Sequence, residues 1–471
     1  MNSERVGTGI ERFDRLIEGG FPRGSLILVA GEAGSGKTMF SAQYLFNGLS
    51  RMNEPGIYVS FGESRETFFS NMKRIGMEFE KYEREGNFKF LDFVTVSSDG
   101  IPDITAYVIE KIVELKAKRI VIDSFSALAQ ALKEKIDSRI ITHVILGKMV
   151  REMGCTTLVL VEKQPGGSGL GAEEYVSDGV ILLGRSQDHF RTLAIKKMRG
   201  TRISEPNVLF TLNFGFQAVE RPAPWSQGIR AGLWKPILDG KTFFSSASSD
   251  LDAVLGGGYP RGRYVVLETE ANVPIDVVNL FDLPLVWNFL SQGRGVIFLP
   301  ALGDDTREIK ARISPHVKGK TFSNLVRVFE HGETTKGKRE SVMLGASGEV
   351  VMESLNATTR RLQEETGQPV LSIVGYPALE NLYEGQIDSL FRGIGVSVAH
   401  NKRVGNLTLA VARPGLRITP MALNIVDCHM QLIERNGCYF FRSVKPIPTG
   451  YFAVGREIIN GCPTLKLTPM M

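Results

Sequence analysis

The sequence has few cysteines, no apolar run long enough to cross a bilayer, and no strong excess of either charge. Four of the 471 residues are cysteine, and their scattered spacing argues against both a disulfide framework and a zinc site; they are Cys155, Cys428, Cys438 and Cys462. The formal net charge of +5 is too small for this length to indicate nucleic-acid binding by charge alone. Hydrophobic residues make up 43% and charged residues 23%, as in soluble globular proteins.

The first residues contain no basic segment followed by an apolar core, so we expect no signal peptide. Because no run is long enough for a transmembrane helix, we also expect no membrane anchor. These two absences predict a cytoplasmic protein. A length of 471 residues favours two domains of a little over two hundred residues each.

Residues 31–38 form a complete phosphate-binding loop between a predicted buried strand, 26–30, and a predicted helix. Its glycines allow backbone N–H groups to point inward, and the helix adds the positive end of its dipole. Lys37 is expected to reach the β and γ phosphates of ATP, and the Thr38 hydroxyl to bind Mg²⁺. The predicted nucleotide-binding residues are Gly31, Glu32, Ala33, Gly34, Ser35, Gly36, Lys37 and Thr38.

Three acidic residues complete the predicted ATP site. Asp123 ends a predicted buried strand, 119–123, and is expected to lie beside Thr38 and hold the Mg²⁺. Glu63 follows the strand 57–61 and is our candidate for orienting or deprotonating the attacking water. The competing interpretation of Glu63 is an acid that only stabilises the start of the next helix. Glu162, at the end of the strand 157–161, is a weaker candidate for sensing the γ phosphate.

The second half of the chain repeats the plan of the first. The segment 8–24, which ends in Gly-Gly-Phe-Pro-Arg-Gly, has an echo at 249–262 that ends in Gly-Gly-Tyr-Pro-Arg-Gly, and Gly24 and Gly262 lie 238 residues apart. Between the copies a proline-rich stretch begins near residue 220. We therefore predict an ATPase domain over 1–220, a linker over 221–240 and a second domain over 241–471. An unrelated second domain with a fortuitous turn is the alternative.

The second copy lacks the chemistry of the phosphate loop. The same offset places residues 269–276 where the loop would be, and this segment contains no glycine. Ile275 stands at the lysine position, Pro274 removes a backbone donor, and Glu270 and Asp276 would repel phosphate. The sequence therefore predicts a second domain that kept the fold and lost the nucleotide.

Several motifs of the first half, in order, resemble the KaiC-type branch of the RecA superfamily. They are the opening segment 8–24, the loop 31–38, the strand end at Asp123 and Ser124, the stretch 171–183, and the Lys-Met-Arg-Gly-Thr run at 197–201. The resemblance covers roughly residues 4–219. It implies two tandem RecA-like α/β domains, each with a twisted, mostly parallel sheet flanked by helices.

The resemblance also implies homo-oligomeric rings, commonly hexamers, with ATP at the subunit interfaces. In that family the basic residues of the last motif reach the γ phosphate of the neighbouring subunit, which assigns a catalytic role in trans to Lys197 and Arg199. Judged without the family, the same residues read as a solvated strand end. The family's clock proteins have two adjacent glutamates at the catalytic position, whereas here Gly62 precedes Glu63, so slow hydrolysis is expected. With residues 269–276 as they stand, we expect no clock-type autokinase.

Three functions remain open from the sequence. The favoured one is an ATPase that acts as a slow oligomeric switch or assembly platform, with a protein partner bound through the second domain. The second is a DNA-handling protein of the recombination-mediator type. It is less favoured, because the glycine-rich loop at 164–171 offers no cation or aromatic residue to bind DNA, although 331–339 is basic. The third is a regulator that senses nucleotide without useful turnover.

Overall fold

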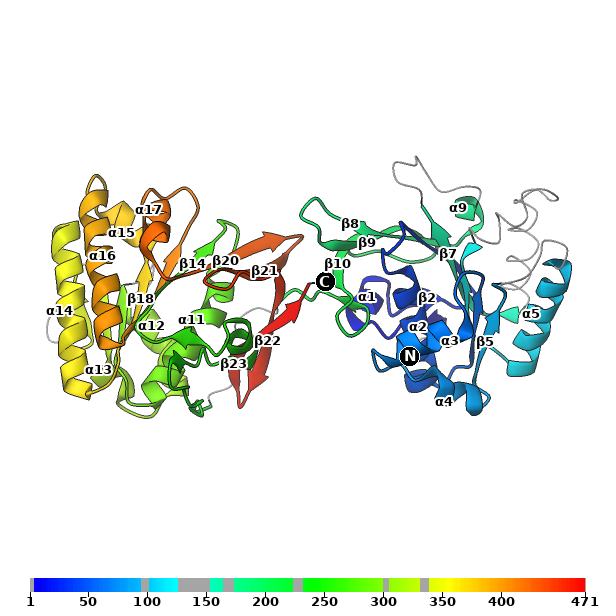
Figure 1. The fold of residues 1–471 in the computed structure, drawn as a ribbon, viewed down its shortest axis with the longest axis horizontal. Coiled ribbons are helices and arrows are strands. Elements are labelled where there is room, and N and C mark those ends of the chain that lie inside the picture. Colours follow the sequence, from blue (N-terminus) through cyan, green and yellow to red (C-terminus); the bar gives the residue numbers. More distant parts are fainter. Residues whose placement is uncertain are drawn as a thin grey trace. The chain divides into compact units, whose positions relative to one another are not determined.

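The computed structural model describes residues 4–94, 101–125, 153–163, 173–222, 232–299, 305–330 and 339–470. The chain divides into two compact units, one of Met1–Glu220 with Met470–Met471, the other of Arg221–Pro469. In each unit helices flank a large, mostly parallel sheet (Figure 1). The predicted α/β fold class is confirmed. Within the described residues, no helix is long and apolar enough to span a membrane.

In the first unit, the described residues form a nine-stranded sheet in the order β11-β10-β9-β8-β3-β7-β6-β4-β5. The strands from β8 to β5 are parallel to one another, and β9, β10 and β11 continue the sheet antiparallel. In chain order the strands are β3 (Leu26–Gly31), β4 (Gly56–Ser60), β5 (Phe88–Asp92), β6 (Arg119–Asp123), β7 (Thr156–Glu162), β8 (Gly179–Arg185), β9 (Arg191–Met198), β10 (Asn207–Thr211) and β11 (Gln217–Ala218).

Strand β3 alternates its side chains between two hydrophobic cores. Ile27 and Val29 join the core beneath α2 and α3, whereas Leu26 and Leu28 join the core beneath α5. A ribbon of β1 (Arg5–Val6) and β2 (Phe21–Pro22) covers the first of these cores together with α1. The helices are α1 (Glu11–Leu16), α2 (Lys37–Met52), α3 (Arg65–Lys73), α4 (Phe79–Arg84), α5 (Ile101–Leu115) and α9 (Glu173–Val176).

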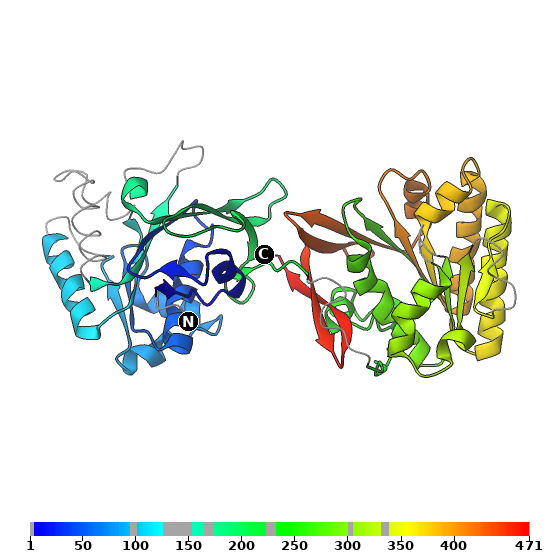
Figure 2. The same cartoon turned by 180° about the vertical axis from the view of Figure 1, so that it is seen from behind.

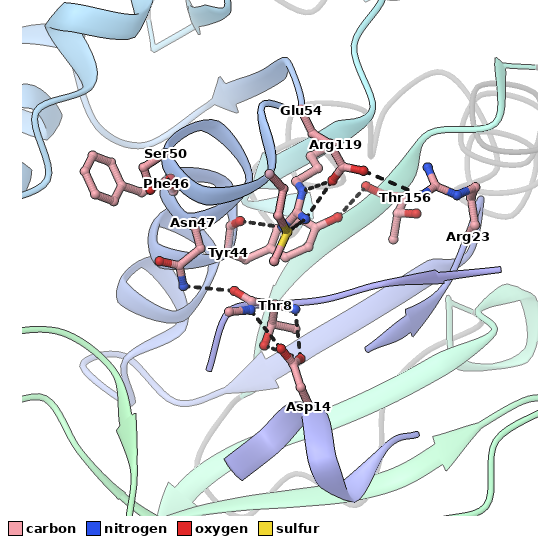
Figure 3. A network of polar contacts seen from close by, with 12 residues as sticks. Thr8, Asp14, Arg23, Tyr44, Phe46, Asn47, Ser50, Glu54, Arg119 and Thr156 are labelled. Atoms are coloured by element: carbon pink, nitrogen blue, oxygen red, sulfur yellow. Dashed lines mark hydrogen bonds and ion pairs between the residues drawn. The ribbon is translucent and has the colours of Figure 1, made fainter. Parts of the chain in front are cut away.

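A fully buried arginine ties α2 to β6 at the ends of these elements that lie away from the phosphate loop. The Arg119 guanidinium donates to Glu54 Oε2 over 2.7 Å and to the Tyr44 carbonyl over 2.8 Å, and it lies over the Tyr44 ring (Figure 3). Gly48 makes the room, because a Cβ there would come within 2.4 Å of Arg119 Nε. Helix α2 begins at Lys37 and strand β6 ends at Asp123, two residues of the predicted ATP site. Arg119 therefore helps to fix the position of α2 relative to β6.

In the second unit, the described residues form a ten-stranded sheet in the order β17-β16-β15-β18-β19-β14-β20-β21-β22-β23. The last three strands are antiparallel and lie at the far end of the unit from α14 (Figures 1 and 2). The strands are β12 (Phe243–Phe244), β13 (Tyr259–Pro260), β14 (Tyr264–Thr269), β15 (Val296–Leu299), β16 (Val326–Glu330), β17 (Ser341–Met343), β18 (Leu371–Gly375), β19 (Leu407–Ala412), β20 (Cys428–Arg435), β21 (Cys438–Lys445), β22 (Phe452–Ile459) and β23 (Cys462–Pro469).

Two helical layers cover the second sheet. One core lies beneath α11, α12 and α13, and the other beneath α14 to α17, of which α14 and α16 lie side by side (Figure 1). The helices are α10 (Ser249–Val254), α11 (Ile275–Ser291), α12 (Thr306–Ile313), the 3-10 helix η3 (Ser314–His316), α13 (Thr321–Leu325), α14 (Gly348–Thr366), α15 (Tyr376–Leu382), α16 (Ile387–Val404) and α17 (Ile418–Ile425).

Elements of the two units recur at the offset found in the sequence. Strand β3 begins at Leu26 and β14 at Tyr264, an offset of 238 residues, and α2 begins at Lys37 and α11 at Ile275, the same offset. Outward from β3 and from β14, the parallel neighbours also follow in the same order: β7, β6, β4 and β5 in one unit, β19, β18, β15 and β16 in the other. Each position of the first site therefore has a defined counterpart in the second unit.

The last part of the predicted linker, residues 232–240, packs on the second unit. Trp234 lies 9% exposed against Trp287, with ring centroids 5.8 Å apart, and the Ile237 N–H donates to Asn288. Asp239 forms an ion pair with Arg294 over 2.6 Å. This stretch is held by side chains on its own unit, while residues 223–231 lie outside the described part of the chain.

Candidate nucleotide-binding site

The phosphate loop lies between β3 and α2, as the sequence predicts. Gly34 and Gly36 have φ of 71° and 101°, in the left-handed region that favours glycine. At Gly31 a Cβ would come within 2.5 Å of both the Leu183 carbonyl and Ser35 Oγ, so only glycine fits. Glu32 and Ala33 are exposed in the loop, with Gly34 beside them. The loop thus has the backbone freedom that a phosphate cradle requires.

Lys37 is buried and turned back onto the loop. Its Nζ donates to the Gly31 carbonyl over 2.8 Å and to the Glu32 carbonyl over 3.0 Å. Burial lowers the pKa of Lys37, and the charges of Glu162 and Asp123 oppose that shift. Glu162 and Asp123, two of the three predicted acids, therefore lie near the Lys37 ammonium group.

Asp123 lies beside Thr38, where the sequence placed it. The Thr38 hydroxyl donates to Asp123 Oδ2 over 2.9 Å, and the Tyr58 hydroxyl donates to the same oxygen over 2.6 Å. Tyr58 was not predicted as a site residue. Burial and the charge of Asp123 raise its pKa well above the usual value, so it remains a donor. A hydroxyl and a carboxylate held together in this way are oxygen ligands suited to Mg²⁺.

Glu63 lies between β4 and α3, with its carboxylate near Asp123. Asn71, on α3, donates to Glu63 Oε1 over 2.9 Å, and the Ser60 hydroxyl donates to the Glu63 carbonyl over 2.7 Å. Burial raises the pKa of Glu63, and the charge of Asp123 raises it further, although the Asn71 hydrogen bond acts in the opposite direction. A carboxyl group with a raised pKa is better suited to proton transfer near neutral pH than an ordinary glutamate is.

One cation beside the loop escaped the sequence analysis. Arg191 begins β9, and its Nη1 donates to the Gly34 carbonyl over 2.9 Å. Burial lowers its pKa, and Arg185, its cross-strand partner on β8, lowers it further. Arg191 adds positive charge to the phosphate-loop end of the sheet. Arg191 and Gly34 are 157 residues apart in the sequence. The closeness of Arg191 to the loop follows from the sheet, in which β8 pairs with both β3 and β9.

Lys197 and Arg199 lie at the opposite end of the sheet from their own phosphate loop. Strand β9 pairs antiparallel with β8, so Arg191 faces Arg185 at the loop end while Met198 faces Gly179 at the other end. Lys197 Nζ donates to the Glu174 carbonyl over 3.0 Å, and Arg199 Nη1 lies 3.6 Å from Asp178 Oδ1. The structure therefore does not bring these two cations to the site of their own subunit.

In the second unit an arginine hydrogen-bonds to the segment that corresponds to the phosphate loop. Arg413 Nη1 donates to the Glu270 carbonyl over 2.5 Å, and its Nη2 donates to the Val273 carbonyl over 3.2 Å. In the strand pairing Gly31 lies opposite Glu162 in the first unit, and the corresponding register makes Arg413 the counterpart of Glu162. The acid of one unit is thus replaced by a cation in the other, and this cation bonds to the loop itself.

Comparisons with known proteins agree with this geometry. The family model for the KaiC ATPase matches residues 6–215. A UPF0273 protein of Thermotoga maritima is 33% identical over 220 residues, which are 42% of this chain and 88% of that protein. The chain belongs to the KaiC-like branch of the RecA-superfamily P-loop ATPases. Its first unit is an ATP-binding ATPase domain of the KaiC type, and the two units form tandem RecA-like domains.

Other KaiC relatives match a larger share of the chain. The circadian clock oscillator protein KaiC of Thermosynechococcus vestitus is 31% identical over 289 residues, 57% of this chain and 52% of that protein. The chain therefore spans about half the length of the clock proteins it matches. A solved KaiC-like protein from Pyrococcus horikoshii OT3 has 35% identity and a TM-score of 0.43, covering 46% of this chain and 99% of that chain. A family model described as GvpD basic region 2 matches residues 233–342.

Proposed function

We propose that this KaiC-like protein is a slow ATPase that works as an oligomeric switch or assembly platform, with ATP bound in the first unit alone. The observation that carries the proposal is the contrast between two corresponding loops. In the first unit Thr38, Asp123 and Lys37 converge on a glycine cradle. In the second unit Arg413 is bonded to the carbonyls of a loop that has no glycine.

Each group of the first site has a role that follows from its position. The backbone N–H groups of residues 31–38 and the Lys37 ammonium would hold the phosphates, once Lys37 leaves the two loop carbonyls. Thr38 and Asp123 would hold Mg²⁺, which neutralises the charge that develops on the phosphate oxygens. Tyr58 would keep Asp123 oriented toward Thr38.

Glu63 would act as the general base or orient the attacking water. Two features favour slow turnover. Asn71 already occupies one oxygen of the Glu63 carboxylate, and the preceding residue is Gly62, so a single acid serves the position. A slow ATPase suits a switch, because the ATP-bound and ADP-bound states then last long enough to be recognised by a partner.

The position of Lys197 and Arg199 favours assembly into a ring, with a hexamer as the proposed form. Cations that cannot reach their own site are available to the ATP of a neighbouring subunit. Cations supplied in trans raise rates by about 10³ to 10⁵ in related phosphoryl-transfer sites. ATP at the interface would then hold the subunits together, and hydrolysis would loosen the assembly. The second unit, free of nucleotide, would present its surface to a protein partner.

The test of this proposal is the number of ATP molecules bound per chain. Isothermal titration calorimetry with Mg²⁺ and ATP is expected to give one site per chain, and Lys37→Ala is expected to abolish binding and nucleotide-dependent assembly. Lys73→Ala, which changes an exposed lysine on α3, is the matched control and should bind as the wild type does. Two equivalent sites, no site, or unchanged binding by Lys37→Ala would contradict the proposal.

A further inference from the structure

The amino-terminal segment of the first unit contacts the turn that follows β9. This turn, residues 199–201, comes directly after the strand that carries Lys197. Arg5, on β1, donates from Nη1 to Thr201 Oγ1 over 2.6 Å and from Nη2 to the Gly200 carbonyl over 2.8 Å. One guanidinium therefore holds two consecutive residues of the turn. Such a two-point contact fixes orientation as well as position, because the fork of the guanidinium is planar.

Arg5 is itself held in place by its own segment. Its Nη2 also donates to Glu18 Oε2 over 2.7 Å, and its side chain is 14% exposed. The β1–β2 pairing sets Arg5 opposite Pro22, so the backbone below the side chain is fixed as well. Because these partners are already in place, Arg5 loses little conformational freedom when it holds the turn.

The same segment contacts the helix that begins at the phosphate loop. Asn47, on α2, donates to the Thr8 carbonyl over 2.9 Å, and the Asp14 carboxylate accepts from the Thr8 and Gly9 N–H groups (Figure 3). A Cβ at Gly9 would come within 2.6 Å of Asn47, so the segment packs directly against α2. Residues 4–24 thus bridge the helix of the ATP site and the turn that carries Arg199 and directly follows the strand of Lys197.

We infer that Arg5 is a positioning residue for Arg199 and, through the end of β9, for Lys197, because it holds the turn 199–201 in the orientation from which these cations reach the nucleotide of a neighbouring subunit. This inference rests on the proposed function, because it needs the trans role of the two cations. Arg5 touches no reacting group itself. Gly200 adopts a left-handed φ of 63°, and a glycine without a Cβ can also adopt other backbone conformations. The contribution of Arg5 is to keep the turn at Gly200 in one of them.

The first variant to examine is Arg5→Ala. We expect kcat for ATP hydrolysis to fall by about 10- to 100-fold, the effect of a misplaced catalytic group, with KM for ATP unchanged because the subunit's own loop is intact. Arg15→Ala is the matched control. Arg15 lies on the same segment but pairs with Glu220 on the surface, and its loss should leave both constants unchanged. A rise in KM with unchanged kcat would overturn the inference.

Mixed assemblies separate a positioning role from a general loss of structure. Glu63→Gln subunits lack the water-orienting acid but retain Arg5 and the turn, so they can serve the intact site of an Arg5→Ala subunit. The mixture is expected to hydrolyse ATP faster than the sum of the two variants measured apart. Lys197→Ala mixed with Glu63→Gln is the reference for the trans role.

The outcomes distinguish the inference from the proposal beneath it. Recovery with Lys197→Ala but not with Arg5→Ala overturns the positioning role alone. Recovery with neither overturns the trans role, and the inference with it. Should Arg5→Ala fail to fold, Thr201→Val replaces it, because this change removes the hydroxyl that Arg5 contacts and keeps the shape of the side chain. Full activity of Thr201→Val together with Arg5→Lys would also overturn the inference.

Discussion

The Thr38 hydroxyl and Asp123 Oδ2 lie 2.9 Å apart although 85 residues separate them in the chain. Strand β6 ends at Asp123, and β3 ends in the loop that leads to Thr38. In the sheet, β7 lies between β6 and β3. Tyr58 reaches the same carboxylate oxygen from β4, on the other side of β6. The Asp123 carboxylate is therefore oriented from two sides by protein hydroxyl groups.

Tyr58→Phe should weaken Mg²⁺ binding and leave the fold intact. The ring contacts with Phe68 and Phe90 remain, and the loss of one hydrogen bond costs about 1 kcal/mol of stability. Of the side-chain hydrogen bonds to the Asp123 carboxylate within the described residues, the one from Thr38 then remains, so a higher Mg²⁺ concentration is expected for half-maximal ATPase activity. The measurement is a Mg²⁺ titration of the ATPase rate. Tyr82→Phe, on α4, serves as the control, and an unshifted Mg²⁺ curve for Tyr58→Phe would show that Asp123 needs no such support.

The raised pKa of Glu63 predicts the acid limb of the pH–rate profile. A general base must be ionised, so kcat is expected to decline on acidification at a pH above the ordinary glutamate pKa of 4.5. Glu63→Gln should abolish turnover and retain ATP binding, whereas Glu66→Gln, an exposed acid on α3, should change neither. Equal turnover in wild type and Glu63→Gln would favour the nucleotide-sensing alternative.

The same pKa shift predicts an effect on stability. Because folding raises the pKa of Glu63, the folded state binds its proton more tightly, and stability is lost as the pH rises through the folded pKa. Glu63→Gln should therefore raise the melting temperature at neutral pH, and the gain should shrink as the pH falls toward the unfolded value. A gain that is independent of pH would contradict this account.

Arg119→Met should destabilise the first unit. The change leaves the Glu54 carboxylate and the Tyr44 carbonyl without their buried partner, and breaking a buried ion pair costs about 3–5 kcal/mol. All three tryptophans, Trp225, Trp234 and Trp287, lie beyond residue 220, so tryptophan fluorescence reports the second unit. We expect Arg119→Met to lower the temperature of the unfolding transition of the first unit, followed by circular dichroism, and to leave the transition temperature measured by tryptophan fluorescence unchanged. If the fluorescence transition temperature fell by the same amount, the assignment of Arg119 to the stability of the first unit alone would be wrong.

Arg413→Met tests the second unit with the same probe. Two hydrogen bonds from a charged donor to loop carbonyls would be lost, at a cost of about 1–3 kcal/mol. The tryptophan transition should move to lower temperature, and ATP stoichiometry should stay at one per chain. Arg417→Met, which changes an exposed arginine nearby, is expected to leave the transition where it is.

The sequence predicts well those features that depend on neighbouring residues. The loop at 31–38 follows a strand directly, and Asp123 ends another strand. A short stretch of sequence is therefore enough to predict where each lies in the fold. Tyr58 and Arg191 are different, because they contact the site only through the order in which β4, β6, β8 and β9 lie in the sheet. In the sequence Arg119 is only the first residue of a strand, and its buried position becomes clear from the structure, where Gly48 leaves room for its side chain. The proposed roles of Lys197 and Arg199 depend on a second subunit, which the sequence of one chain does not place.

The hydrogen bonds of Arg413 to the carbonyls of residues 270 and 273 also bear on which substitutions could give the second unit a phosphate site. Ile275→Lys alone would add a second positive charge to a segment whose carbonyls already bond to Arg413, and the missing glycines would still deny phosphate its backbone donors. Arg413→Glu alone would remove the two hydrogen bonds to the loop carbonyls and add another acid to a segment that already contains Glu270 and Asp276. If the second unit binds no nucleotide, as proposed, neither substitution alone would give it a phosphate site, and several changes would be needed together.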